Sequence, residues 1–265
     1  MEDESRKMAS VPTSRLLAEA IEIADNASTN SPRYSKILSA LHSRADDDVL
    51  NTALSLCRDP RPARRKLGTK ILGELGSPVR QFSEPAEAVL CDLVRNDLND
   101  EIVAAAAFAI GHRASKRCVD ELVRISFSAN REIRYGAAFA LAATQDVAVA
   151  PALLRLMCDS YDRARDWATT GIAGMIDLNT PEVRSALHVA TRDSDPQVRS
   201  EAFEGLAARR EKDAIPALIA ELEARTEPAY RFVEAAEKYL GHTWEGDDIG
   251  DLVLQLRQVA RARSG

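Results

Sequence analysis

Four arginines stand at matching positions along the chain: Arg65, Arg134, Arg165 and Arg199. The polar turns just before them carry Asp59, Asn130, Asp159, Asp193 and Asp195. A row of guanidinium groups along one ridge would bind anions. The alternative is structural: the Asp or Asn caps the helix that follows, and the arginine binds carboxylates or carbonyls of the neighbouring segment. The recurrence favours the structural role, because a binding site rarely needs the same residue so many times.

A second candidate for binding is an aromatic pair with charged neighbours, formed by Tyr135 beside Arg134 and by Trp167 beside Asp166. One position equivalent to Trp167 holds Glu201 and others hold small residues, so we expect the tryptophan to be partly exposed. Partly exposed Tyr, Trp and Arg side chains are typical of the residues that dominate the affinity of protein interfaces. The alternative is that Trp167 simply packs between two successive segments.

Motifs for catalysis or metal binding are not found in the sequence. The residues that could bind a metal are four histidines and four cysteines: His42, His112, His188, His242, Cys57, Cys91, Cys118 and Cys158. They form no HExxH or CxxC pair, and there is no GxSxG, P-loop or GxGxxG motif. We therefore predict no catalytic residues, no metal site and no cofactor. The cysteines lie among apolar residues, so we expect buried free thiols in a reducing cytoplasm.

The charge balance limits the partners. The 265-residue chain has 35 Lys and Arg against 41 Asp and Glu, a formal net charge of -6. This acidic excess argues against nucleic acid, because phosphate contacts dominate such binding. The basic run 58–70 is expected to be a solvated face, with binding of a phosphate or an acidic protein patch as the alternative. No run reaches the roughly 18 apolar residues that span a bilayer, and no secretory signal is evident, so we predict a cytoplasmic location.

The elements that must position these residues belong to an internal repeat. In its clearest copy, residues 193–206, a polar turn is followed by an apolar residue and Arg199, then by Ala202 and Leu206. The position of Arg199, called the frame position, recurs at 34, 65, 103, 134, 165, 199 and 233, with spacings of 31 to 38 residues. Such a spacing indicates stacked helix pairs. The small residue three positions after the frame lets neighbouring helices approach closely.

Each copy predicts two helices. The first contains the frame position, as in residues 131–143, and the second has apolar residues three and four apart, as in residues 215–222. Three glycines follow the Leu or Ile of the first helix directly: Gly73, Gly111 and Gly241. Because glycine favours helix C-termini, we expect the first helices to end there.

The motif D-x-[DN]-x-x-[VI]-R-x-x-A-x-x-x-[LI]-[GA], which covers about residues 33–263, resembles bacterial HEAT repeats, including the phycobilin-lyase-type HEAT-like repeats. The resemblance implies an all-α fold, a right-handed α-solenoid of about seven HEAT-like helix pairs. The amphipathic segment 14–27 is expected to be a helix that caps the first pair. We predict a disordered lead-in over 1–12 and a single solenoid domain over 13–265.

The function expected of such a solenoid is that of a non-catalytic protein-binding platform: a scaffold, a regulator or an immunity-type inhibitor of a toxin. We place its binding surface mainly on the second helices, where mixed charges suit a protein or peptide partner. The predicted partner-binding residues are Arg124, Arg134, Tyr135, Arg155, Asp166, Trp167, Arg184 and His188. The alternatives are a HEAT-like DNA glycosylase or other nucleic-acid-directed enzyme and, from resemblance alone, a bilin-lyase-like activity.

Overall fold

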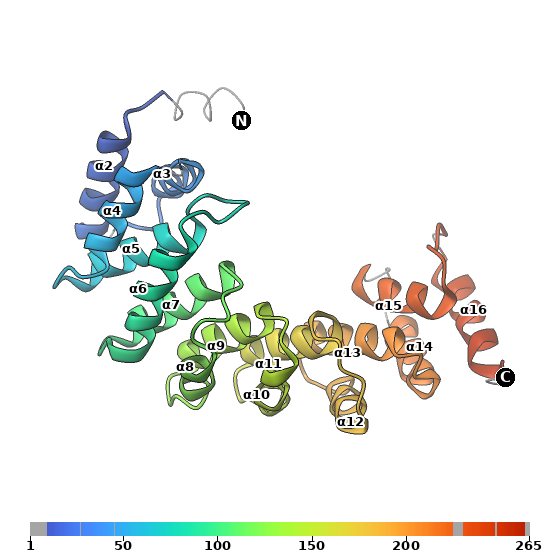
Figure 1. Cartoon of the computed structure of the whole chain (residues 1–265). Coiled ribbons are helices and arrows are strands. Elements are labelled where there is room, and N and C mark those ends of the chain that lie inside the picture. The colour runs from blue at the N-terminus through green and yellow to red at the C-terminus, as the bar shows by residue number, and fades with distance from the viewer. Residues whose placement is uncertain (1–9, 27, 45, 225–229, 247, 263–265) are drawn as a thin grey trace. The chain divides into compact units, whose positions relative to one another are not determined.

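The molecule is helical throughout the part that the structure describes. The computed structural model describes residues 10–26, 28–44, 46–224, 230–246 and 248–262, and every regular element in these ranges is a helix (Figure 1). This confirms the predicted all-α fold of helix pairs. No helix in these ranges is both long and apolar enough to cross a membrane.

The helices group into two compact units, residues 1–144 and 145–265, and each is described by itself. The single domain over 13–265 therefore stays a prediction. The disordered lead-in was predicted over 1–12, of which residues 1–9 lie outside the described residues. The remaining three residues lead directly into the first described helix.

The helices of the first unit run in pairs. They are α2 (Thr13–Asp25), α3 (Pro32–Ser43), α4 (Asp47–Leu56), α5 (Pro62–Glu74), α6 (Ser83–Asn96), α7 (Asp100–His112), α8 (Val119–Ile125) and α9 (Arg131–Ala143). The frame positions lie on α3, α5, α7 and α9, which we call frame helices; α4, α6 and α8 are the second helices.

The second unit continues the same alternation. Its frame helices are α11 (Asp162–Thr170), which runs on into the π-helical turn η2 (Gly171–Met175), α13 (Pro196–Ala208) and α15 (Tyr230–Leu240). Its second helices are α10 (Ala150–Leu156), α12 (Pro181–Ala190), α14 (Ile215–Glu223) and α16 (Ile249–Arg261). Two short 3-10 turns, η1 (Val147–Val149) and η3 (Lys212–Ala214), precede α10 and α14.

Close packing between helices depends on the small residue of the repeat, as predicted. A Cβ atom added at Gly68 would lie 2.7 Å from the carbonyl oxygen of Ala53 and 2.8 Å from the backbone nitrogen of Cys57, so only glycine lets α5 come this close to α4. Successive frame helices also pack directly on one another, α5 on α7 and α7 on α9. Helix α2 contacts α3, α4 and α5 and buries Leu16 and Leu17, which is the capping role expected of it.

The prediction that three glycines end frame helices is right for one and wrong for two. Gly241 follows α15 and has a φ of 79°, which glycine adopts without strain. Gly73 and Gly111 instead lie inside α5 and α7. A Cβ atom at Gly73 would lie 3.0 Å from Cα of Ala109, and one at Gly111 would lie 2.5 Å from a ring carbon of Phe139. These two glycines allow successive frame helices to approach, rather than ending them.

The recurring arginines have the structural role. Arg165 donates two hydrogen bonds to the Asp193 carboxylate of the next turn, at 2.7 and 2.8 Å, and one to the carbonyl of Asp159 in its own turn, at 2.9 Å. Arg65 binds Asp97 in the same way, at 2.7 and 3.2 Å. Carbonyls of their own turns also accept hydrogen bonds from Arg134 and Arg199.

The acidic and amide residues of the turns divide into two roles. Asn130 caps α9 by accepting the N–H of Glu132 at 2.9 Å, and Asp195 caps α13 by accepting the N–H of Gln197 at 2.7 Å. The expectation of capping is wrong for the other three, because each stands two residues before the capping position and accepts the N–H of that residue: Asp59, Asp159 and Asp193.

Replacing Asp193 by asparagine is expected to lower the free energy of unfolding of the second unit by about 1–3 kcal/mol at pH 7. Burial would raise the pKa of Asp193, but hydrogen bonds from Arg165 and from the Asp195 N–H outweigh it and hold the pKa below its usual 3.8. A pKa lowered by folding stabilises the fold above the usual value, and this stability is lost as the pH falls through the folded value.

Urea unfolding followed by tryptophan fluorescence measures this effect, because Trp167 and Trp244 both lie in the second unit. The difference in the free energy of unfolding between the wild-type chain and Asp193→Asn should shrink as the pH falls below 3.8. If this difference stayed constant down to pH values at which the carboxyl of the folded chain is protonated, the stabilising role given to the Asp193 carboxylate would be wrong.

Three of the four cysteines are buried thiols, as predicted: Cys57, Cys91 and Cys118. The prediction is wrong for Cys158, which is exposed. Cys158 comes two residues after the end of α10, in the turn toward α11, and so has left the apolar face of the helix.

Candidate functional site

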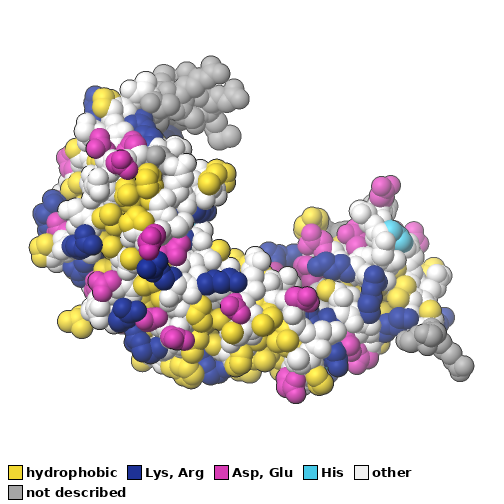
Figure 2. Space-filling model, viewed as in Figure 1, with side chains coloured by type: hydrophobic (Ala, Val, Ile, Leu, Met, Phe, Trp, Pro, Cys, Tyr) yellow, Lys and Arg dark blue, Asp and Glu magenta, His cyan; other side chains and the backbone are white. Residues whose placement is uncertain are grey.

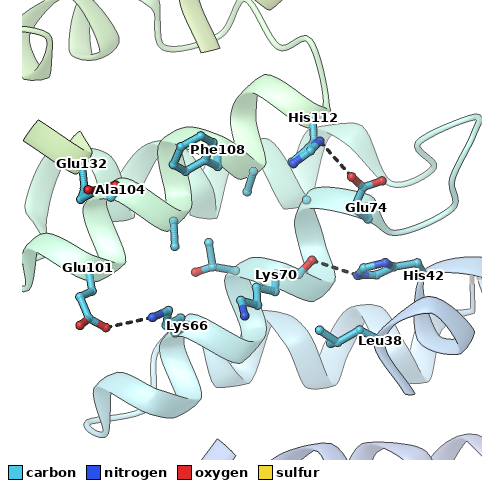
Figure 3. Close-up of a pocket in the computed structure, with 14 residues that line it drawn as sticks. Leu38, His42, Lys66, Lys70, Glu74, Glu101, Ala104, Phe108, His112 and Glu132 are labelled. Carbon is cyan, nitrogen blue, oxygen red and sulfur yellow. Dashed lines mark hydrogen bonds and ion pairs between the residues drawn. The ribbon is translucent and has the colours of Figure 1, made fainter. Parts of the chain in front are cut away.

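A hollow of about 600 Å³ opens in the first unit over the frame helices α3, α5, α7 and α9 (Figure 3). Leu38 and His42 line it from α3, Lys70 from α5, Phe108 from α7 and Glu132 from α9. All of its lining residues come from frame helices. The hollow is therefore a product of how the frame helices stack.

The floor of the hollow is made of very small residues. Gly73, Ala104, Ala105 and Ala109 lie where α5 and α7 approach each other, and their short side chains leave a shallow apolar recess. Phe108 stands beside this floor. Two aromatic rings of α9 pack against its ring, with centroids 4.7 Å away for Tyr135 and 5.7 Å away for Phe139. This wall is held in place by its neighbours.

Most charged groups around the hollow are neutralised within it. Lys66 pairs with Glu101 at 3.0 Å. Glu74 pairs with His112 at 2.9 Å and with Arg80 at 2.8 Å. These pairs leave little free charge on the two sides of the floor.

Lys70 is different. Among the described residues it has no carboxylate partner; its Nζ lies 5.4 Å from the centre of the Tyr34 ring, and its carbonyl oxygen is 3.1 Å from Nε2 of His42. The side chain is half-buried, and burial, followed by the charge of Lys66, lowers its pKa from the usual 10.5. Burial likewise lowers the pKa of His42, which favours the neutral imidazole. Lys70 is thus a cation of the hollow for which the described residues supply no carboxylate partner.

The structure places the predicted second-helix residues outside this hollow. Arg124 is exposed on α8 and donates to the carbonyl of Val94 at 3.1 Å. Arg155 lies on α10 of the second unit. Arg184 and His188 lie on α12, where the first pairs with Glu211 at 3.4 Å and the second with Asp213 at 3.3 Å. The second helices, which we expected to form the binding surface, therefore do not line the hollow of the first unit; the frame helices do.

The reason for this difference is the position of the small residues. Gly73, Ala105 and Ala109 of the frame helices line the hollow, and no second helix contributes a residue to it. The signal was present in the sequence as small residues three or four apart beyond the frame motif. We expected Gly73 to end its helix, and took the small residues equivalent to Trp167, Ala105 among them, only as a sign that this position is not deep core.

The predicted aromatic pair falls in two different units. Tyr135 is partly exposed on α9 and contacts Phe108, one of the residues lining the hollow. Trp167 and Asp166 are partly exposed on α11, as expected for Trp167, and burial followed by the charge of Asp195 raises the pKa of Asp166. The binding role of these residues and of Arg134 stays a prediction.

The basic run 58–70 is largely paired. Arg61 and Arg64 bind Asp59 and Asp25, while the next two basic residues bind carboxylates of the following turn and helix. Figure 2 shows charged side chains of both signs scattered among hydrophobic ones on the displayed face. The run is thus largely an ion-paired surface. Two of its described members, Arg58 and Lys70, have no carboxylate partner; Arg58 is exposed, whereas Lys70 is half-buried.

Known proteins share the repeat and the fold. Residues 87–173 match the family model for HEAT repeats. Protein YibA of Escherichia coli strain K12 is 26% identical over 192 residues, which cover 70% of this chain and 68% of YibA. The X-ray structure of YibA superposes with a TM-score of 0.73 at 20% identity, covering 98% of this chain and 97% of that one. A computationally designed armadillo repeat protein for modular peptide recognition gives 0.50 at 16% identity, over 79% and 99% of the two chains.

Proposed function

We propose that this chain, which resembles bacterial HEAT-repeat proteins in its repeat and its fold, is a non-catalytic protein-binding platform whose first-unit hollow holds a segment of a partner protein. The occupant is a peptide segment in which an acidic side chain stands next to an apolar one. A scaffold, a regulator and an immunity-type inhibitor of a toxin would all use such a surface to hold their partner.

The observation that carries this proposal is the half-buried Lys70 beside an apolar floor. A carboxylate that reaches Lys70 would form an ion pair in a partly desolvated recess, where the attraction between opposite charges is stronger than at an open surface. An apolar side chain next to that carboxylate would cover Ala105 and Ala109 and contact the ring of Phe108. Burying it there would add the stabilisation that apolar area gives when it leaves water.

The size of the hollow and the chemistry of its charged groups support a bound segment rather than a reaction. About 600 Å³ is room for a few side chains, within the range of about 300–1,000 Å³ found for binding pockets. The groups that would serve as acid or base, Glu74 and His112, are bound to each other. The designed armadillo repeat protein for modular peptide recognition, which has a similar fold, adds support for a peptide as the occupant.

Selection of random peptides on the full chain tests the proposal. Displayed peptides are selected on the wild-type chain and on Ala105→Trp, in which an indole fills the hollow. Ala105 is partly exposed on the floor, so the substitution leaves the core intact, as circular dichroism and thermal unfolding will verify. We expect the wild-type chain to enrich peptides with an acidic residue beside an apolar one, and Ala105→Trp to enrich none. Enrichment of the same peptides on both chains would refute the proposal.

The enzyme alternatives have a simple test of their own. A HEAT-like DNA glycosylase would hold duplex DNA at low salt and release it steeply as the salt rises. The net charge of -6 and the paired basic run 58–70 argue against this behaviour. The other alternative, a bilin-lyase-like activity, was suggested by resemblance alone, and we propose no role in it for the residues that line the hollow.

A further inference from the structure

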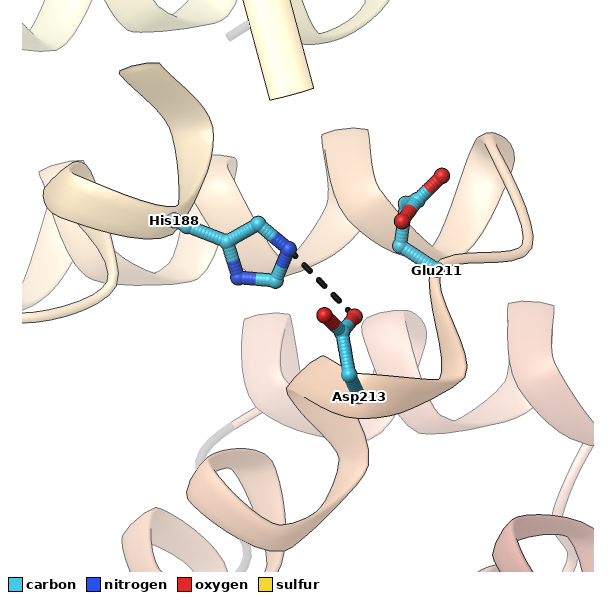
Figure 4. A group of neighbouring side chains, drawn as sticks. All are labelled: His188, Glu211 and Asp213. Carbon is cyan, nitrogen blue, oxygen red and sulfur yellow. Dashed lines mark ion pairs between the residues drawn. The ribbon is translucent and has the colours of Figure 1, made fainter. Parts of the chain in front are cut away.

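Three side chains with metal-binding atoms meet in the second unit, on the side of α12. His188 comes from the last turn of α12, Glu211 from the turn after α13, and Asp213 from η3. One donor atom from each lies within 4.8 Å of the other two, and Nε2 of His188 is 3.3 Å from Oδ1 of Asp213. Figure 4 shows the imidazole of His188 pointing toward the Asp213 carboxylate, with Glu211 beside them. The sequence pattern gives no sign of this grouping, because Glu211 and Asp213 follow the next helix along the chain.

The segment that carries the carboxylates is held by its own hydrogen bonds. Arg210 adopts a φ of 58° after α13, and the N–H of Glu211 then donates to the carbonyl of Leu206 at 3.0 Å. The hydroxyl of Tyr239 on α15 donates to the carbonyl of Glu211 at 2.7 Å. These contacts fix the backbone of the donors before any ligand binds, which reduces the ordering that binding requires.

A cation already stands beside this group of donors. Nε of Arg184 is 3.4 Å from Oε1 of Glu211, and its Nη1 donates to Asn179 at 2.8 Å. The guanidinium therefore neutralises one of the two carboxylates. A metal ion that binds here must compete with this charge.

We propose that His188, Glu211 and Asp213 form a binding site for a divalent transition-metal ion of the Zn²⁺ type, with Arg184 as the competing counter-ion. One imidazole nitrogen and two carboxylate oxygens are ligands that Zn²⁺ accepts, leaving a fourth position for water or a ligand from a partner. Imidazole favours zinc and its neighbours over Mg²⁺ and Ca²⁺.

The geometry needs only side-chain movement to reach coordination. Donor atoms around a tetrahedral zinc ion stand about 3.3 Å apart, given metal–ligand distances near 2.0 Å. The pair of His188 and Asp213 already has this spacing, at 3.3 Å. The side chains of Glu211 and Asp213 are 28% and 72% exposed, so both carboxylates have room to rotate inward.

Calorimetric titration of ZnCl₂ into the full chain, freed of any affinity tag, tests the site. All chains carry Cys158→Ser, because that exposed thiol would bind zinc by itself. We expect one bound ion, and His188→Ala and Asp213→Asn should each weaken its affinity at least about tenfold. Arg184→Gln should strengthen it by removing the competing charge. His242→Ala, which removes an exposed histidine elsewhere in the unit, should leave the affinity unchanged.

Asp213→Asn keeps the test valid even if His188→Ala disturbs the fold, since the Asp213 side chain is mostly exposed and the amide has the same shape. Circular dichroism of each variant verifies the helix content. Absence of zinc binding, or an affinity that neither His188→Ala nor Asp213→Asn lowers, would overturn the proposal. Weakening by Arg184→Gln as strong as that by His188→Ala would overturn it as well.

Discussion

Replacing Arg113 by alanine is expected to lower the free energy of unfolding of the first unit by about 3–5 kcal/mol. Arg113 is 8% exposed, and its guanidinium donates to the carbonyls of Leu72 at 2.8 Å, Gln81 at 2.7 Å and Arg80 at 3.1 Å. These carbonyls lie at the end of α5 and in the loop to α6, so one side chain joins α7 to the preceding pair. Each acceptor left without its donor costs about 1–3 kcal/mol.

Urea unfolding followed by circular dichroism measures this loss in the first unit, which contains neither tryptophan. The matched control is Arg117→Ala, because Arg117 is exposed and its described ion pair, with Glu84 at 3.6 Å, is a loose one. We expect that variant to stay within about 0.5 kcal/mol of the wild-type chain. An equal effect of the two substitutions would contradict the role given to Arg113.

The second large effect concerns binding. In a chain carrying Lys70→Glu, the affinity for a peptide selected on the wild-type chain is expected to fall at least about 30-fold. The substitution replaces the cation of the hollow, which lacks a described carboxylate partner, by an anion that repels the acidic side chain of the peptide. Lys70→Gln removes the charge without reversing it and should give a smaller loss. Fluorescence anisotropy of the labelled peptide measures both affinities.

Lys66→Gln is the matched control for this prediction. Lys66 lines the same hollow on the same helix, but its charge is already paired with Glu101 at 3.0 Å. Because an exposed pair contributes little, we expect Lys66→Gln to change the affinity by at most about fivefold. Equal weakening by Lys66→Gln and Lys70→Gln would contradict the prediction. It would mean that the lysine without a carboxylate partner binds the peptide no better than the lysine that is paired with Glu101.

The sequence was sufficient for the pairing of helices and for the ladder of arginines. The spacing of frame positions placed Arg165 near the start of a helix, and its bidentate contact with Asp193 of the next turn follows from the repeat itself. A periodic pattern shows which residues of a helix face a neighbour, because those residues must be apolar or small. The small residue of the motif, expected to let neighbouring helices approach closely, is indeed buried in the clearest copy, where it is Ala202, and Leu206 of that copy is buried as well.

The same pattern does not show where a surface is recessed. The hollow depends on how closely α5 and α7 approach each other, and the contact of Gly73 with Ala109 sets this distance. The sequence did not predict this contact, because Gly73 was expected to end its helix. Long-range contacts of single side chains are also outside the pattern. Arg113 donates back to the carbonyl of Leu72 in α5, and in the second unit Arg209 donates to the carbonyls of Ile172 and Leu178. No sequence motif links either arginine to its acceptors.

The most direct test of the central claim, that the hollow over the frame helices binds the partner, is the affinity of the selected peptide for two variants of the first unit. Ala105→Trp fills the hollow, whereas Arg124→Glu reverses an exposed charge on the row of second helices. We expect Ala105→Trp to abolish binding and Arg124→Glu to leave it intact. Loss of binding in Arg124→Glu, with normal binding in Ala105→Trp, would contradict this claim and place the partner on the second helices.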